Sequence, residues 1–368
     1  MDALETMHNS LQGSTDLVLS SQWVEAGNRR REAVRAAHDQ SQATLLSLLD
    51  HYMTLKSAAK AAVSPDTRRL YHLGVRRFLE FAAGRDGPNT RLELTRCDVD
   101  DIERWQVSLQ QVGLSANSVS SYLYGVRALY RALKWAGAAD ENPAAAAKPP
   151  RERTPAHARK GALPVNVYRR LLDLPAERYG ADDPRRVRDA ALLALGGSAG
   201  LRAAEICGLN IPDIELTLHR LVVRFGKGGK RRLVPLSGQL EGVLAAWLTV
   251  RSALVLRGQA REDEPALLIS LSSNASLGRR LTPAGGRFIA AGYYRLLGLP
   301  PEMWGLHTLR RTAGTHLYRA TRDLYVVADV LGHSSVNTSA IYAKMDLESR
   351  REAVQAMEDL RDREENLP

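Results

Sequence analysis

The sequence predicts a mainly α-helical protein that carries one short β-hairpin in its second half and is divided into two domains. Three observations lead to this fold class. The chain has 368 residues, more than one ordinary domain holds. Apolar residues recur at three-four spacing through much of residues 42–145, as amphipathic helices require. Two β-rich segments flank a glycine-rich turn within residues 220–236, which is the pattern of a hairpin.

Composition and charge indicate a soluble protein with a polyanionic partner. Hydrophobic residues make up 44% of the chain and charged residues 25%, and the net charge is +10. Clustered basic residues favour DNA or RNA as that partner. No apolar run of about 18 residues predicts a membrane span, and the polar N-terminus argues against a secretory signal. Two cysteines in separate contexts, Cys97 and Cys207, indicate a reducing compartment, and the cytoplasm is the expected location.

The first half of the chain is expected to contain an extension and a helical domain. Residues 1–41 form a polar N-terminal extension, in which NRRREAVRAAHD is either a short helix or a loosely held arm. In the helical domain, residues 42–145, one helix starts at the cap Ser64 and stops near Gly84. Another follows the cap Ser115. Its apolar stripe is a core-facing surface without a catalytic role.

The second half is expected to begin after a basic linker. Residues 146–164 are rich in proline and positive charge and show no periodic pattern. The second domain spans residues 165–368. Within it, residues 261–286 are expected to be a looped insertion. The highly charged C-terminal helix has a sparse apolar stripe, which favours docking on a partner over completing its own domain.

The first two stretches that could do chemistry surround a short helix and the hairpin. In AGLRAAEICGL, Arg202 starts a short helix and Glu205 lies one turn further on, which by itself is an ordinary ion pair. In RLVVRFGKGGKRRLVPL, Lys227 lies near the hairpin tip. A nucleotide-binding P-loop is rejected, because its lysine is followed by serine or threonine and opens a helix. A lysine on a β-turn can instead lie over a bound backbone and donate a proton.

Two further stretches contain histidines. In HTLRRTAGTHL, His307 and Arg310 share one helix face and could bind one anion. In LGHSSVNTSAIYAK, Gly332 ends a helix, His333 lies in the turn, and Tyr342 falls on or after the next helix. A helix-turn-helix DNA reader is the alternative for this last stretch, and a purely structural role is the alternative for its His and Tyr. A zinc site is rejected for lack of ligand spacing.

Together these stretches place two arginines, a lysine, two histidines and a tyrosine in a basic protein. This inventory suits phosphoryl transfer without a metal ion or other cofactor. Guanidiniums can bind the non-bridging oxygens, histidines can move the nucleophile's proton, and lysine can protonate the departing 5′ oxygen. A pocket of cations is expected to favour the phenolate of Tyr342. An aryl phosphate ester stays reactive, so a DNA hydroxyl can reverse the step without ATP.

The four stretches, in this order, resemble the motifs of tyrosine recombinases of the Xer and phage-integrase family. His333 lies nine positions before Tyr342, the spacing that this family uses. The resemblance covers about residues 42–360 and implies that Tyr342 is the nucleophile, Lys227 the general acid and Glu205 a supporting acid. The other catalytic residues that it implies are Arg202, His307, Arg310 and His333. Arg311 departs from the pattern, because many members have a second histidine there.

The same resemblance implies a fold and a mode of action. Residues 42–145 are similar to a core-binding domain, which closes with the catalytic domain as a C-shaped clamp around duplex DNA. The implied activity is site-specific recombination through a covalent 3′-phosphotyrosyl intermediate, by a homo-tetramer or paired recombinases on two sites. A DNA translocase or accessory protein is a candidate partner. The alternatives are a type IB topoisomerase, which relaxes DNA without a special site, and a DNA-binding regulator that kept the fold.

Overall fold

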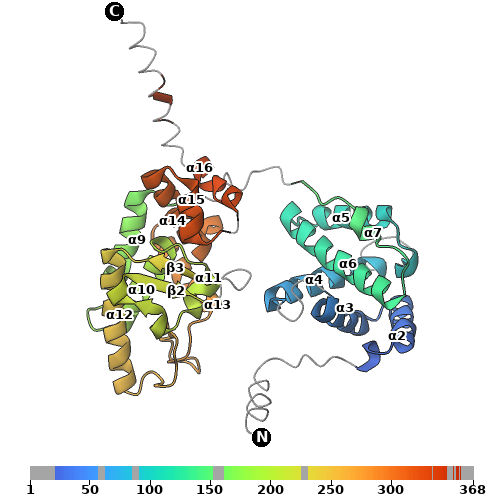
Figure 1. The fold of residues 1–368 in the computed structure, drawn as a ribbon, viewed down its shortest axis with the longest axis horizontal. Helices are drawn as coiled ribbons and strands as arrows, with labels where there is room; N and C mark the ends of the chain where they lie inside the picture. Colours follow the sequence, from blue (N-terminus) through green and yellow to red (C-terminus); the bar gives the residue numbers. More distant parts are fainter. Residues whose placement is uncertain are drawn as a thin grey trace, which may run out of the picture. The chain divides into compact units, whose positions relative to one another are not determined.

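The computed structural model describes residues 21–56, 63–84, 91–151, 161–224, 231–333 and 335–345, and the four tail positions 351, 354, 355 and 357. The chain divides into two compact units, residues 1–153 and 154–368. The described residues are mainly helical and include one small antiparallel sheet (Figure 1), which confirms the predicted fold class.

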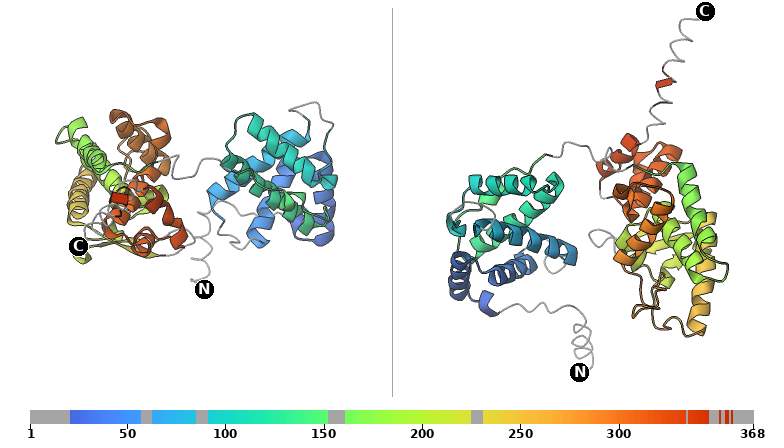
Figure 2. Two further views of the ribbon diagram at one scale, coloured as in Figure 1. Left: turned by 90° about the horizontal axis from the view of Figure 1, so that it is seen from above. Right: turned by 180° about the vertical axis from the view of Figure 1, so that it is seen from behind.

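The regular elements described in the first unit are all helical (Figure 2). They are η2 Ser21–Trp23, α2 Ala26–Asp39, α3 Gln42–Lys56, α4 Pro65–Ala82, η4 Leu94–Arg96, α5 Val99–Gln111, α6 Ala116–Ala136 and α7 Pro143–Ala146. Ser64 and Ser115 cap α4 and α6 as predicted. Each hydroxyl accepts the backbone N–H three residues further on at 3.2 Å, which satisfies a donor that the first turn leaves unpaired.

Helices α4 and α6 lie side by side in the first unit because two glycines let their backbones meet (Figure 1). A Cβ at Gly74 of α4 would lie 2.5 Å from the carbonyl oxygen of Tyr122. Reciprocally, a Cβ at Gly125 of α6 would lie 2.6 Å from the carbonyl oxygen of Tyr71. Neither position can hold a side chain without separating the helices.

Part of the predicted polar extension belongs to the core of the first unit. Trp23 is fully buried, and its Nε1 donates to the Ser47 hydroxyl at 3.0 Å. On α2, the buried residues are the alanines Ala33, Ala36 and Ala37. A helix that packs through alanines has a weakly apolar face, so its sequence looks polar although one side is buried. The arginines of α2 face outward or lie over a ring, as Arg29 does 4.1 Å from the centre of Trp135.

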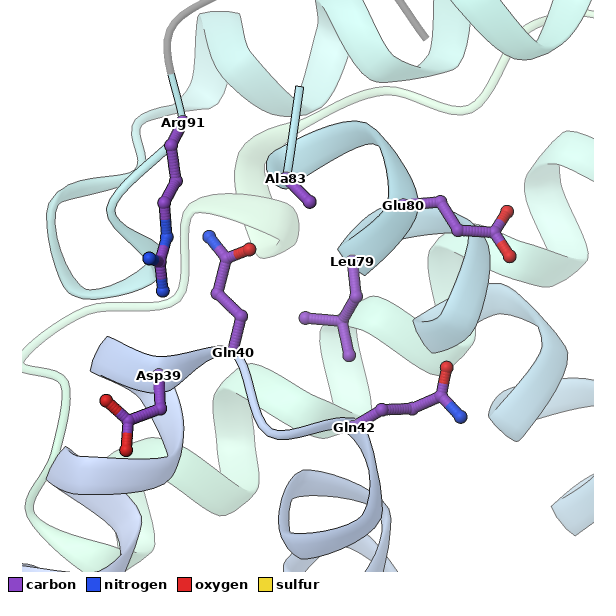
Figure 3. A pocket seen from close by; sticks show the side chains of 7 residues that line it. All are labelled: Asp39, Gln40, Gln42, Leu79, Glu80, Ala83 and Arg91. Atoms are coloured by element: carbon purple, nitrogen blue, oxygen red, sulfur yellow. The ribbon is translucent and has the colours of Figure 1, made fainter. Parts of the chain in front are cut away.

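The first unit also contains a polar pocket of about 350 Å³ (Figure 3). It is lined by Asp39, Gln40, Gln42, Leu79, Glu80, Ala83 and Arg91. Gln40 and Arg91 tie its wall together, donating to the carbonyl oxygens of Leu92 and His38 at 2.7 and 2.6 Å. None of the residues predicted to do chemistry lines this pocket.

The second unit combines helices with a three-stranded sheet. Its elements are α9 Val165–Arg178, α10 Pro184–Gly197, α11 Ala203–Gly208, η5 Ile211–Asp213, β1 Ile214–Glu215, η6 Leu216–Leu218, β2 Arg220–Val223, β3 Arg232–Pro235, α12 Gly238–Leu256, α13 Pro283–Leu296, η7 Pro301–Met303, α14 Leu306–Thr321, α15 Leu324–Leu331, η8 Val336–Thr338 and α16 Ala340–Met345. Strands β2 and β3 form the predicted hairpin, with Val223 opposite Arg232. The short strand β1 adds a third member that the sequence pattern had not indicated.

Helix α10 lies at the centre of the second unit. Its residues from Ala191 to Leu195 are all buried, and it packs against α9, α12 and α14. Helix α12 is long and apolar enough, by length and composition alone, to cross a membrane. One of its faces nevertheless belongs to the core of this unit, where Leu244 and Trp247 are fully buried and Trp247 Nε1 donates to the Leu267 carbonyl at 2.8 Å.

The expectation of a looped insertion at residues 261–286 is wrong for its central part. Residues 266–269 are fully buried, and bridges pair Ala266 with Asn210 and Ile269 with Arg280. The side chain of Arg280 donates to the carbonyls of Cys207 and Leu209, at 3.0 and 3.1 Å. Residues 266–269 are a short apolar segment within a mostly polar stretch, and they complete the core beside α11.

Replacing Gly125 with alanine is expected to destabilise the first unit by about 1–3 kcal/mol, because the added methyl group forces α4 away from α6. The free energy of unfolding from urea denaturation measures this effect. Gly27→Ala on α2 is the matched control, because its Cβ would meet nothing closer than 3.8 Å. Equal stability of the Gly125 variant and the wild type would contradict the close helix contact.

Candidate active site

The first site residue, Arg202, is placed by a tight turn between α10 and α11. Gly200 has a φ of +67°, a left-handed conformation that favours glycine, and it turns the chain at the end of α10. Arg202 then forms the N-cap of α11, as the sequence predicts. Its backbone N–H donates to Glu205 Oε2 at 2.9 Å, and its Nη1 donates to Glu205 Oε1 at 2.7 Å. A quarter of the Arg202 side chain stays exposed.

Glu205 is the centre of a cluster of guanidiniums. Both of its oxygens accept from Arg232 on β3, from Nη1 and Nη2 at 2.9 Å each. The Nη1 of Arg310 on α14 lies 3.8 Å from Oε2. Burial alone would raise the pKa of Glu205, but hydrogen bonds from Arg232 and Arg202 lower this pKa to about 2. The carboxylate is therefore ionised at neutral pH although it is buried.

Arg310 is almost completely buried and is held by two backbone carbonyls. Its Nη1 donates to the Gly200 oxygen and its Nη2 to the Leu331 oxygen, both at 2.7 Å. Burial lowers the pKa of Arg310 to about 10, and the positive charge of Arg202 contributes. The side chain remains protonated at neutral pH. A guanidinium has five N–H donors, so donors remain for a bound anion.

His333 lies in the turn after α15, as predicted from Gly332. That glycine has a φ of +66° and ends the helix, and the His333 backbone N–H donates to the Ala328 carbonyl at 2.8 Å. The His333 Nδ1 lies 2.7 Å from the hydroxyl of Ser339, a fully buried residue. Burial lowers the pKa of His333 to about 4, with further lowering by the charges of Arg310 and Arg202. The imidazole is therefore neutral at neutral pH.

Tyr342 lies on α16 and is buried against α14. A Cβ at Gly314 would lie 2.6 Å from Cζ of the tyrosine, so only glycine leaves room for this ring. The ring lies parallel to that of His333, at 9° with 5.9 Å between centres. We expected the surrounding cations to favour the phenolate. Instead burial raises the pKa of Tyr342, and the charges of Arg310, Arg311 and Arg202 offset this only in part. The phenol is protonated until a base removes its proton.

His307 and Lys227 are the two remaining residues of the predicted site. His307 is exposed near the start of α14, one turn before Arg310, so the two share a helix face as predicted. Lys227 lies in residues 225–230, outside the described part of the chain. Strand β2 ends before that segment and β3 begins after it, and the placement of Lys227 at the hairpin tip stays a prediction.

Two side chains of the cluster, Arg232 and Ser339, are not among the residues predicted from the sequence. A signal existed for each. Arg232 is two residues before the buried Val234 on β3, so strand alternation places both on one face. Ser339 precedes Tyr342 by three residues, about one helical turn. Neither signal says which polar group the side chain meets.

The chemistry of this cluster is that of an anion site. Arg202, Arg232 and Arg310 surround a single carboxylate, Glu205, and His333 is neutral, so positive charge is left uncompensated. Among the described residues, no three histidine, cysteine or acidic side chains are grouped so that they could hold a metal ion. Guanidiniums beside a buried phenol and a neutral imidazole can bind a phosphate and activate a hydroxyl against it.

Family models match both halves of the chain. The phage integrase family matches residues 162–348, and the phage integrase N-terminal SAM-like domain matches residues 54–137. Tyrosine recombinase XerC of Mycobacterium leprae (strain TN) is 32% identical over 303 residues, which cover 81% of this chain and 93% of that protein. Tyrosine recombinase XerC 1 of Ralstonia nicotianae is 31% identical and covers 86% and 92%.

Solved structures share the fold. The XerH site-specific recombinase bound to palindromic difH substrate, in a post-cleavage complex, has a TM-score of 0.65 at 20% identity. That match covers 92% of this chain and 99% of the XerH chain. A lambda integrase dimer bound to a COC′ core site has a TM-score of 0.58 at 15% identity and covers 93% and 87%.

The burial of His333 among cations predicts that its imidazole titrates near pH 4, against 6.5 for a free histidine. NMR titration of the histidine ring protons measures the midpoint. Arg202→Gln removes one positive charge and is expected to raise the pKa of His333. Between about pH 4 and 6.5, His333 is protonated in the unfolded chain but neutral in the folded protein. The free energy of unfolding that His333 contributes therefore rises with pH in this range. A titration midpoint near pH 6.5 in the folded protein would refute the burial of His333 beside these arginines.

Proposed function

The chain belongs to the phage integrase family and is a tyrosine-type site-specific recombinase, and on this premise we propose that Tyr342 cuts DNA by forming a covalent 3′-phosphotyrosyl bond. The observation that carries the proposal is the packing of a buried tyrosine and a neutral histidine against Arg310 and the Glu205 cluster. A tyrosine with a purely structural role in a core needs no such set of guanidiniums.

In the proposed step, the phenolic oxygen of Tyr342 attacks phosphorus while the bond from phosphorus to the 5′ oxygen breaks. Arg202 and Arg310 bind the non-bridging oxygens, whose negative charge grows in the transition state. Neutral His333 is the candidate base for the phenolic proton, because its ring lies beside that of Tyr342 and the bond of Nδ1 to Ser339 leaves Nε2 as the second ring nitrogen that can take a proton. We assign His307 to a hydrogen bond with the phosphate.

The departing 5′ oxygen needs a proton, and we assign its donor to Lys227. The products are a 3′-phosphotyrosyl ester and a free 5′-hydroxyl. The attack of a 5′-hydroxyl from the same or another strand on this ester restores Tyr342 and rejoins DNA. Every charge that the step needs comes from side chains, so the proposed reaction uses neither a metal ion nor ATP.

The DNA partner is proposed from charge and from relatives. A net charge of +10 favours binding to the phosphate backbone. The XerH and lambda integrase structures that share this fold are bound to difH substrate and to a core site, the latter as a dimer.

We propose that the two domains close as a clamp around duplex DNA. The proposed working assembly is a homo-tetramer or a pair of recombinases on two sites, and it acts in the cytoplasm at the nucleoid. The C-terminal helix, which lies largely outside the described residues, is proposed to dock on a neighbouring protomer.

The Tyr342→Phe variant is expected to form no covalent DNA adduct while binding DNA almost as the wild type does, because only the phenolic oxygen is lost. The protein is mixed with fragmented genomic DNA from its source, non-covalent complexes are removed with detergent, and attached DNA is sequenced. Filter binding of the same fragments measures affinity for both proteins.

Each outcome of this capture experiment separates the candidate functions. Enrichment of one short site, with two inverted half-sites around a spacer, supports the site-specific recombinase. Capture without sequence preference would favour a topoisomerase. Binding without capture by either protein would favour a DNA-binding regulator, and an adduct with the Phe variant would identify a different nucleophile.

The Arg202→Ala variant is expected to slow cleavage by about 100- to 1,000-fold, as removal of one oxyanion donor does. Arg202 is partly exposed, and among the described residues its side chain bonds to Glu205, so the fold should survive. The rate of adduct formation on a nicked site measures the effect at saturating protein. Arg170→Ala is the control, because that exposed arginine pairs with Glu177 away from the cluster. Cleavage at the wild-type rate would remove Arg202 from the mechanism.

A further inference from the structure

Arg232 is a third arginine of the cluster, and its contacts differ from those of the other two. Its side chain is only 12% exposed, and both of its Nη groups donate to the two oxygens of Glu205 at 2.9 Å. This is the parallel, two-bond arrangement that fixes a carboxylate in one orientation. Arg202 reaches the same carboxylate with a single Nη and its backbone N–H.

The stem of Arg232 also packs against the turn that holds His333. A Cβ at Gly332 would lie 2.5 Å from Cδ and 2.8 Å from Nε of Arg232, so this arginine passes directly over the glycine backbone. Strand β3 and helix α15 are in contact here. Arg232 therefore links three segments: the hairpin on which it lies, the helix α11 of Glu205, and the turn before His333.

A contribution to the stability of the fold does not explain the contacts of Arg232. Its Nε is buried and has no hydrogen-bond partner among the described residues. A buried ion pair is weak support for folding, because removing both charges from water offsets most of their attraction. With both Nη groups directed at Glu205, the side chain is also poorly placed to act as a clamp on phosphate. The two parallel hydrogen bonds instead fix the position and orientation of the Glu205 carboxylate.

We propose that Arg232 is a positioning residue for DNA cleavage, which fixes Glu205 so that Glu205 can orient Arg202 and lie beside Arg310. The inference rests on the proposed function of this cluster. Without Arg232, the carboxylate of Glu205 would have one direct guanidinium partner instead of two, and it could rotate or take up a proton. Arg202 would then lose the group that sets the direction of its guanidinium.

The test is the rate of single-turnover cleavage of a nicked DNA site by full-length protein at saturating concentration. Arg232→Met keeps the length of the stem and removes the charge, and the rate is expected to fall by about 100-fold, the size of effect that a small misplacement causes. Arg232→Lys restores the charge without the planar fork, so a partial recovery is expected. Arg224→Met is the matched control, because Arg224, the residue after β2, pairs with the buried carboxylate of Asp213.

A pH profile separates positioning from a structural role. Among the described residues, the charged or titratable groups that interact with Glu205 are Arg202, Arg232, Arg310 and His333. In the wild type, the pKa of Glu205 is about 2, so its titration leaves the rate unchanged at ordinary pH. Loss of Arg232 raises this pKa, because burial still opposes the charge and the largest of the contributions that lower the pKa, the hydrogen bonds from Arg232, is removed. Cleavage by Arg232→Met should therefore decline as pH falls from about 7 to 5, near the range of a perturbed carboxyl.

The double variant Arg232→Met/Glu205→Gln identifies the side chain whose protonation causes that decline in the cleavage rate. If Glu205 is the titrating group, the acid limb disappears in the double variant, and the inference holds. If the limb persists, His333 is titrating and action through Glu205 is refuted. The inference would also be overturned if Arg232→Met cleaved DNA at the wild-type rate, or if Arg224→Met lost as much of the cleavage rate as Arg232→Met does. Failure of the wild type itself to form an adduct would instead refute the proposed function.

Discussion

The site depends on one buried carboxylate. Three guanidiniums from α11, β3 and α14 meet at Glu205, and without its negative charge they would repel one another in a space with little water. The charge of Glu205 also opposes the lowering of the Arg310 pKa that burial causes. Because one negative charge faces three positive ones, the cluster stays cationic. That imbalance suits a phosphate group, whose own charge completes the neutralisation.

Much of the local structure could be predicted from the sequence because it depends on neighbours along the chain. The caps Ser64 and Ser115, the end of α15 at Gly332 and the hairpin strands β2 and β3 all follow from short-range rules. What the sequence could not give is the meeting of distant segments. The contact of Arg232 with Glu205 joins positions 27 residues apart, and the pKa of Tyr342 depends on burial that only the folded chain defines.

Two stretches differ from the structure predicted for them, for the same physical reason. Both residues 21–39 and residues 261–286 bury a small apolar surface within mostly polar sequence. On α2 the buried face consists of alanines, which allow close helix packing but contribute little to an apolar pattern. In the second stretch, residues 266–269 are buried between a charged segment, residues 261–264, and a segment rich in serine, residues 270–276. Burial of short or small segments leaves almost no periodic signal. The roles of Lys227 and of the charged tail stay predictions.

The bonds of Arg310 to two carbonyls have a mechanical consequence. One carbonyl belongs to Gly200, at the turn before α11, and the other to Leu331, at the last residue of α15. A fluctuation that unwinds the end of α15 would release Arg310 and shift the His333 turn at the same moment. The same fluctuation would loosen the turn that leads to Arg202. The cluster should thus open and close as one cooperative unit, so that intermediate, half-assembled states of the site are scarce.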